Sequence, residues 1–505
     1  MSNSSANDSL ATSVVSGTGW LYASSYGGKV INLIATAVLA RLLTQEDFGV
    51  AGYALVFIGF LEVLEGFGVG QALVFMREKD ESRNMAFWIA VIFGFLLGIA
   101  TYFAAPLAGV LFNDPRAVPV TQALALIFPI TALRTVHRAI LQRRMQFSLI
   151  ALPEFSKAGV KAFAAIAFAL FSLGAWSLII AQLAASLVET LMYWKIHKWR
   201  PSLKIKFDRS VFKTLTSYGG GIAGLNVLGV LVNNIDNILI GRYMGAIALG
   251  TYMMGFRVPS LLIRQFVTTI SQVIFPVFVH MNERKDSLAD GWLKAIRYIL
   301  IFTVPASLGL AAVAEPFVLA IFGQKWAGAI PVVAAISLFT LAFSTSFNIG
   351  DVYKAMGRIG LIVKINLFQA AILIPSMWYV TLKYQDIAFI AWTHVVVKVL
   401  MSILQLVIVG RVLSISLSQI ARAMGTPLAA GILMCGCVLL CNEFTREWAE
   451  HWRLLAGIAT GTVVYGTLAW FLLRQDIKDA IEVVRQGKRQ KKRTEEIDAM
   501  PIPPQ

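Results

Sequence analysis

Residues 232–250 read VNNIDNILIGRYMGAIALG, and a related stretch occurs earlier in the chain. An ungapped shift of 201 residues places it on residues 31–49, INLIATAVLARLLTQEDFG, with Arg242 over Arg41. Apolar residues fill most positions on both sides of the matched arginines. The two copies therefore predict a duplicated pair of long apolar helices joined by a short connection.

The composition places most of the chain in lipid. Of its 505 residues, 57% are hydrophobic and 14% are charged, and the mean hydropathy is +0.70. A water-soluble domain could not bury that much apolar surface, so we expect an all-α polytopic membrane protein. Runs of about 20 apolar residues predict about fourteen transmembrane helices, near 19–42, 47–70, 86–112, 117–138, 148–172, 175–196, 212–240, 246–279, 293–318, 328–352, 358–381, 386–411, 419–441 and 453–474.

The basic residues predict the orientation of these helices. With fourteen spans, 31 of the 44 Lys and Arg residues lie on one face and seven on the other. Basic residues are retained in the cytoplasm, so we expect both termini to be cytoplasmic and the first span to remain as an anchor. The net charge of +16 is then explained by topology and by anionic lipid headgroups, and no nucleic-acid partner is expected.

The repeat predicts the domain organisation. Six spans separate the two copies, so both run in the same direction and are related by an axis along the membrane normal. This duplication is typical of transporters, whose site lies between two lobes near the bilayer midplane. We expect a six-helix lobe at 1–196, a basic cytoplasmic linker at 197–211, a second six-helix lobe at 212–411, two further helices at 412–474 and a cytoplasmic tail at 475–505.

The repeated stretch carries polar residues at bilayer depth. Asn233, Asp236 and Asn237 share one helical face, and Asn32 in the first copy shares a face with Lys29. Such side chains can be accommodated only against each other or against a water-filled cavity. We expect these two polar stripes to line the space between the lobes.

Further cations occur inside the expected spans. Arg257 and Arg264 share a face of the eighth span, and Lys398 shares a face of the twelfth with His394. Each charge costs about 2.5 to 3.5 kcal/mol at the centre of a helix, which favours a solvated cavity and an anionic ligand such as a pyrophosphate. The candidate substrate-binding residues are Lys29, Asn32, Arg257, Arg264, Asn233, Asn237 and Lys398.

The acids allow two interpretations. Glu62, Glu65 and Asp236 are either salt-bridge partners or carriers of a coupling proton or sodium ion. Glu154 and Lys157, one turn apart on the fifth span, form either a structural pair or part of a polar cavity.

No cofactor, metal site or catalytic residue is predicted. Cys435, Cys437 and Cys441 lie in one expected span with no further ligand nearby, so packing explains them. Residues 219–224, GGGIAG, match a dinucleotide-binding pattern in letters, but no strand precedes them and close helix packing is the better interpretation. The chain has no Walker motif, and its outer loops are too short for a periplasmic catalytic domain. We therefore do not expect an enzyme.

Several stretches carry a family resemblance. They are ARLLTQEDFGVAGYALVFIGFLEVLEGFGVGQALV, RRMQF, GAWSLIIAQL, NNIDNILIGRYMGAIALGTY, VIFPVF and AEPFVLAIFGQKWAGAIPVV. In order and spacing they resemble the Wzx-type polysaccharide and O-antigen flippases of the multidrug/oligosaccharidyl-lipid/polysaccharide exporter superfamily, over about residues 15 to 410.

The resemblance implies a function. It implies a bacterial inner-membrane protein that flips undecaprenyl-pyrophosphate-linked oligosaccharide repeat units by alternating access, for exopolysaccharide, O-antigen, lipopolysaccharide or capsule synthesis. The implied partners are that lipid-linked oligosaccharide, membrane lipids and the polysaccharide polymerase and export machinery. The family's cavity carries basic residues on the first, second, seventh and eighth spans, whereas the second span here offers only Glu62 and Glu65. The alternatives are an ion-coupled multidrug antiporter and a lipid II flippase of the same superfamily.

Overall fold

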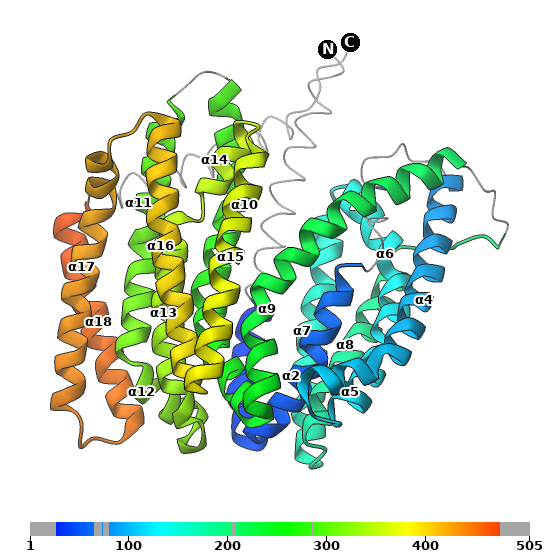
Figure 1. The fold of residues 1–505 in the computed structure, drawn as a ribbon, viewed down its shortest axis with the longest axis horizontal. Helices are drawn as coiled ribbons and strands as arrows, with labels where there is room; N and C mark the ends of the chain where they lie inside the picture. Colours follow the sequence, from blue (N-terminus) through cyan, green and yellow to red (C-terminus); the bar gives the residue numbers. More distant parts are fainter. Residues whose placement is uncertain (1–26, 65–72, 74–79, 204–208, 284–286, 475–505) are drawn as a thin grey trace, which may run out of the picture. The chain divides into compact units, whose positions relative to one another are not determined.

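A computed structural model describes residues 27–64, 73, 80–203, 209–283 and 287–474 (Figure 1). The described residues form helices and connections without strands, which confirms the all-α class. Within them, ten helical segments are long and apolar enough to cross a bilayer. The fifth expected span falls outside this set because α7 (Phe147–Leu170) carries three charged residues. The number fourteen stays a prediction.

The chain divides into two compact units. Among the described residues, the N-terminal unit comprises residues 27–234 and 245–247, and the C-terminal unit comprises residues 235–244 and 248–474. The dividing point therefore lies within α9 (Arg209–Pro259). The lobe boundaries expected from the sequence stay predictions.

The N-terminal unit is a set of helices that follow the expected spans closely. Its helices cover residues 27–42, α2 (Gln45–Glu62), α4 (Asp80–Phe112), α5 (Ala117–Leu124), α6 (Ile127–Arg143), α7, α8 (Ala175–Ile196) and the first part of α9. The described part of the expected linker also belongs to this unit. There the amide nitrogen of Ser202 donates to Asn84 Oδ1 at 2.7 Å, and Trp88 Nε1 donates to the Ser202 carbonyl at 2.9 Å, so this segment is held against α4.

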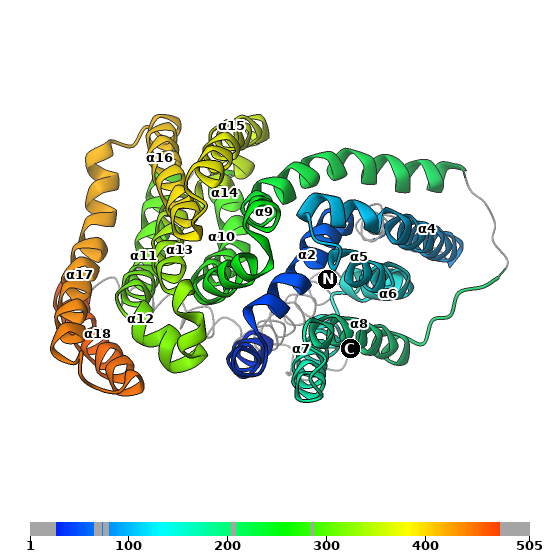
Figure 2. The same cartoon turned by 60° about the horizontal axis from the view of Figure 1, so that its bottom comes forward.

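The C-terminal unit has more irregular helices. Its elements are the second part of α9, η2 (Ser260–Arg264), α10 (Gln265–Glu283), α11 (Leu288–Ala312), α12 (Ala314–Phe317), η3 (Val318–Phe322), η4 (Gln324–Ala329), α13 (Ile330–Ser346), α14 (Ile349–Ala355), α15 (Ile359–Tyr384), α16 (Ile387–Leu413), α17 (Leu417–Phe444) and α18 (Glu450–Leu472). In this unit α13 packs against both α11 and α16, and α17 packs against both α11 and α18 (Figures 1 and 2). Gly431 on α17 lets Val304 of α11 approach closely.

The backbone supports the 201-residue repeat. In the first copy the helix breaks before α2, where Thr44 has extended backbone angles and caps α2 by accepting from the amide of Asp47 at 3.1 Å. Position 245 corresponds to position 44, and Gly245 interrupts α9 with φ of 82°. A side chain would be strained in that conformation, so a glycine provides the break that a capping threonine provides in the first copy.

Small residues allow a close contact between α4 and α6 in the N-terminal unit. Gly94 and Gly98 are four residues apart on α4, and both face α6. A Cβ atom added at Gly94 would lie 2.5 Å from Ala132 Cβ and 3.0 Å from the Phe128 carbonyl oxygen. Helices in lipid associate through such close backbone approach, because the lipid tails remove the hydrophobic driving force.

This contact generates a stability prediction. We expect Gly94→Val to lower the stability of the purified protein by about 1 to 3 kcal/mol, because the added methyl groups must push α6 away from α4. Thermal unfolding in detergent, followed by fluorescence-detected elution, measures the effect. The matched control is Gly436→Val on α17, where an added Cβ meets no atom within 4 Å. Equal midpoints for the two variants would contradict the packing role of Gly94.

Candidate functional site

A buried carboxylate forms the centre of a polar cluster in the C-terminal unit. Asp236 on α9 is only 1% exposed. Its Oδ2 accepts a hydrogen bond from the Tyr252 hydroxyl at 2.8 Å and lies 3.0 Å from His394 Nε2 on α16. Its Oδ1 accepts from the backbone N–H of Asn237 at 2.8 Å. A carboxylate only accepts, so Nε2 is assigned as the protonated nitrogen of His394.

Two cations gather next to this carboxylate on one aromatic ring. The guanidinium of Arg264 lies 5.4 Å from the centroid of Phe343, and the ammonium of Lys398 lies 5.3 Å from the same centroid. Lys398 is one turn after His394 on α16, so both side chains leave the same helical face. Asp236 is within electrostatic reach of Arg264, and Arg264 of Lys398. The cluster therefore joins one carboxylate, one histidine and two cations.

Aromatic rings enclose the histidine side of the cluster. The His394 ring lies 5.4 Å from the ring of Phe339 and 6.1 Å from that of Phe256, centroid to centroid. Phe256 also lies 6.0 Å from the Tyr252 ring. This apolar surrounding lowers the local dielectric and strengthens each charge interaction within it.

The backbone around Arg264 departs from α-helical geometry. Residues Ser260–Arg264 form a π-helical turn that begins directly after Pro259 and ends at Arg264. Proline lacks an N–H, and a π turn absorbs an extra residue, so the helix is locally rebuilt at the point where the guanidinium leaves it. Such turns occur frequently at functional sites.

A second polar cluster joins α10 to α14. The hydroxyl of Ser271 donates to Oδ2 of Asp351, which is 4% exposed, and Lys354 Nζ donates to Oδ1 of the same acid at 3.2 Å. Neither Ser271 nor Asp351 was predicted as a site residue. The acid at the end of the expected span 328–352 was the available signal.

The N-terminal unit has its own ionic network. Glu189 on α8 is 2% exposed, and its carboxylate pairs with Lys157 at 2.8 Å and with Arg134 at 3.3 Å. Glu154 pairs instead with Arg138 on α6 at 3.1 Å. Glu154 and Lys157 therefore form structural ion pairs, which is one of the two interpretations. Each pairs with a residue of a neighbouring helix, and they do not pair with each other. Partners on α6 and α8 could not be predicted from the spacing of charges along α7 alone.

The structure brings some of the predicted residues together. Asp236, Arg264 and Lys398 share the C-terminal cluster, and Asn237 contributes its backbone N–H to it. Arg257 follows Phe256 directly on α9 and is half-buried. Tyr252 and Phe343 belong to the cluster but were missed, because a tyrosine or phenylalanine in an apolar span carries no distinguishing pattern.

The remaining predicted residues that the structure describes belong to the N-terminal unit. Lys29 and Asn32 are half-buried on helix 27–42 of the N-terminal unit. Asn233 is exposed, and its amide donates to the Gly229 carbonyl of its own helix at 2.7 Å. Glu62 is exposed near the end of α2. Glu65 lies outside the described residues.

The described residues contain no group of three or more His, Cys, Asp or Glu side chains arranged to hold a metal ion. The three cysteines, all on α17, are free thiols. The C-terminal cluster offers two cationic side chains, Arg264 and Lys398, of the kind that can bind an anion.

Long apolar helices with ionic groups buried inside them define a multi-pass membrane protein. Solved structures share this fold. The lipid II flippase MurJ in an inward closed conformation matches 90% of this chain and 99% of its own, with a TM-score of 0.72 and 16% identity. An inward-facing multidrug resistance MATE family transporter matches 77% of this chain and 94% of its own, with a TM-score of 0.66 and 15% identity.

Sequence comparison defines the family. Residues 38–331 match the model described as polysaccharide biosynthesis protein, and the chain belongs to that family. Similar relatives are teichuronic acid biosynthesis protein TuaB of Bacillus subtilis (strain 168), 24% identical over 90% of this chain and 95% of TuaB, and succinoglycan biosynthesis transport protein ExoT of Rhizobium meliloti (strain 1021), 24% identical over 95% and 97%. Lipopolysaccharide biosynthesis protein WzxC of Escherichia coli (strain K12) is 26% identical over 73% and 75%. The resemblance to polysaccharide flippases is thereby confirmed.

The buried acid generates a prediction that depends on its partners. We expect Asp236→Ala to destabilise the purified protein by about 3 to 5 kcal/mol, because it leaves the buried His394 and Tyr252 donors without their acceptor. Asp236→Asn keeps an acceptor oxygen and should cost less. Thermal unfolding in detergent provides the measurement.

The control is Glu443→Ala, which removes an exposed pair with Arg446 and should cost at most about 1 kcal/mol. A stability of Asp236→Ala equal to that of the control would show that the Asp236 cluster does not hold α9 to α16.

Proposed function

We propose that this protein flips undecaprenyl-pyrophosphate-linked oligosaccharide repeat units from the cytoplasmic to the periplasmic leaflet of a bacterial inner membrane. Family membership and the names of the relatives support this proposal, since those proteins serve the biosynthesis of teichuronic acid, succinoglycan and lipopolysaccharide. The delivered units then serve polysaccharide assembly at the outer leaflet.

The burial of Lys398 links the proposed substrate to the C-terminal cluster. Lys398 is 8% exposed, its ammonium lies against the Phe343 ring, and no carboxylate of the described residues forms an ion pair with it. A buried cation of this kind is costly in a helix that crosses a membrane, and such residues usually mark a substrate pathway. A pyrophosphate supplies the opposite charge, and Arg264 beside Lys398 adds a planar guanidinium that suits phosphate oxygens.

The neighbouring acid provides a route to substrate release. With Asp236 ionised and His394 neutral, the cluster that also contains Arg264 and Lys398 has a net charge of +1. Uptake of one proton on Asp236 or His394 adds a second positive charge and strengthens the attraction for a pyrophosphate, and loss of that proton weakens it. We therefore propose Asp236 as the residue that couples proton binding to substrate binding. The transport mechanism is alternating access between two six-helix lobes.

The proposed cycle assigns further roles. Lys29, Asn32, Arg257, Asn233 and Asn237 are proposed to contact the headgroup and sugars in the course of transport, and both termini are proposed to be cytoplasmic. Glu62 and Glu65 remain alternative coupling residues. The protein acts as a transporter, and the chemistry of polymer formation belongs to the polymerase and export machinery with which it works.

The test of this function is deletion of the gene in its host. Surface polysaccharide is quantified together with the lipid-linked oligosaccharide that accumulates in the inner membrane. We expect loss of polymer with trapped lipid-linked repeat unit, whose sugars identify the cargo. Intact polysaccharide with new sensitivity to cationic drugs would favour an ion-coupled multidrug antiporter, and accumulation of lipid II with a cell-wall defect would favour a lipid II flippase.

Substitutions in the cluster test the cationic site. We expect Lys398→Ala and Arg264→Ala each to lower polymer export by roughly 10- to 100-fold in a complemented deletion strain, because a charge-assisted hydrogen bond is worth about 1.5 to 3 kcal/mol. Lys29→Ala should act in the same direction, whereas Lys398→Arg and Lys29→Arg keep the charge and should retain partial export. Export is measured as surface polysaccharide per amount of inserted protein.

The matched control is Lys383→Ala, which removes an exposed lysine whose ammonium contacts Tyr379 and Tyr384 at the end of α15. Normal export by the Lys398→Ala, Arg264→Ala and Lys29→Ala variants would refute the cationic site.

A further inference from the structure

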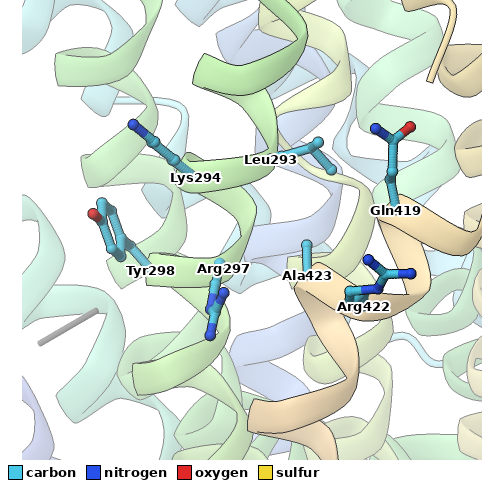
Figure 3. A pocket seen from close by; sticks show the side chains of 7 residues that line it. All are labelled: Leu293, Lys294, Arg297, Tyr298, Gln419, Arg422 and Ala423. Carbon is cyan, nitrogen blue, oxygen red and sulfur yellow. The ribbon is translucent and has the colours of Figure 1, made fainter. Parts of the chain in front are cut away.

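A separate basic pocket lies between α11 and α17 of the C-terminal unit. Its volume is about 300 Å³. Figure 3 shows the seven side chains that line it, with four from α11 and three from α17. The lining residues are Leu293, Lys294, Arg297, Tyr298, Gln419, Arg422 and Ala423. None of them belongs to the Asp236 cluster.

The pocket is built to attract an anion. Lys294, Arg297 and Arg422 contribute three positive charges, and none of the seven lining residues is an acid. The residues recur with the same helical spacing on both helices, at 294, 297 and 298 on α11 and at 419, 422 and 423 on α17. Residues three and four apart lie along one helical face, so α11 places Lys294 and Arg297 at the pocket and α17 places Arg422 there.

The pocket lies in the N-terminal halves of α11 and α17, two helices that pack against each other. Ser287 and Ser416 cap these two helices by accepting from the amides of Asp290 and Gln419, so both ends are well defined.

The remaining lining is that of a membrane interface. Leu293 and Ala423 provide an apolar wall, and the Tyr298 ring is typical of the headgroup region. Along the same α17 helix, Ile432 and Leu433 are exposed large apolar side chains. The distribution of Lys and Arg predicts that this end of both helices is cytoplasmic. A molecule with a phosphate and long apolar chains fits these surroundings better than a soluble anion does.

We propose that this pocket binds the phosphate of an anionic membrane phospholipid at the cytoplasmic surface. Lys294, Arg297 and Arg422 hold the phosphate, Gln419 donates to the glycerol or headgroup oxygens, and the acyl chains lie along the apolar surface of α17. Basic pockets between membrane helices on the cytoplasmic side bind lipid headgroups in this way. The bound lipid is a resident of the fold and is distinct from the transported cargo.

Native mass spectrometry of the purified full-length protein tests this site. The protein is titrated in detergent with phosphatidylglycerol and, separately, with phosphatidylethanolamine as the zwitterionic comparison. We expect one tightly held phosphatidylglycerol adduct in the unaltered protein. Arg297→Gln combined with Arg422→Gln should reduce its occupancy at least tenfold, and each single substitution should give an intermediate loss.

The charge-matched control is Arg411→Gln, which removes an exposed cation from the end of α16, outside the pocket. It should keep the adduct. Elution profile and thermal midpoint confirm that each variant is folded, and the single variants provide the comparison if the double variant is not. Undiminished phosphatidylglycerol binding by folded Arg297→Gln and Arg422→Gln variants would overturn the proposal.

The source of the phosphate is tested separately. Millimolar inorganic phosphate is added to the lipid-bound protein. Retention of the lipid supports a membrane ligand, whereas its complete displacement would assign the pocket to a soluble phosphate and overturn the lipid assignment. None of these measurements depends on transport, so a failed flippase test and a failed lipid-binding test are distinguishable.

Discussion

The interior of the C-terminal unit depends on the partners of one carboxylate. An ionised acid that is withdrawn from water costs several kcal/mol unless hydrogen bonds and opposite charge compensate for it. Asp236 has these partners in Tyr252, His394 and the backbone of Asn237, which tie the second part of α9 to α16. The side chains packed around that tie then fix the positions of Arg264 and Lys398 on the Phe343 ring. A structural bond and a candidate binding site are therefore parts of one cluster.

The N-terminal unit solves the same electrostatic problem differently. Glu189 is flanked by Lys157 and Arg134 from two neighbouring helices, so its charge is neutralised locally. Asp236 instead has its direct partners in a tyrosine, a histidine and a backbone N–H, and the two nearby cations lie on an aromatic ring. The ionic network of α6, α7 and α8 thus holds helices together through direct ion pairs, whereas the buried acid of the C-terminal unit is held by hydrogen-bond donors.

The sequence predicted the fold class well, because runs of about twenty apolar residues are local features and a repeat is visible when the sequence is compared with itself. It also predicted Asp236, Arg264 and Lys398 as polar groups of interest, since charges are conspicuous in an apolar span, and their role stays a prediction. It could not identify their partners. Tyr252, Phe343 and Ser271 are ordinary residues for a membrane helix, and only the packing of α9, α10 and α13 places them beside charges. The pairing of Glu154 with Arg138 could not be predicted either, because contacts between helices leave no periodic signal along one helix.

The π-helical turn at Ser260–Arg264 has a geometric consequence. Each residue of an α-helix advances about 100° around the axis, and a π turn accommodates one residue more than an α turn does. Converting this turn to regular α-helix would therefore rotate Arg264 by about that angle relative to Pro259 while breaking few backbone hydrogen bonds. The guanidinium would leave the Phe343 ring and face a different neighbour. A single residue of helical register thus separates two orientations of the charge, which gives this helix the geometry of a rotary switch.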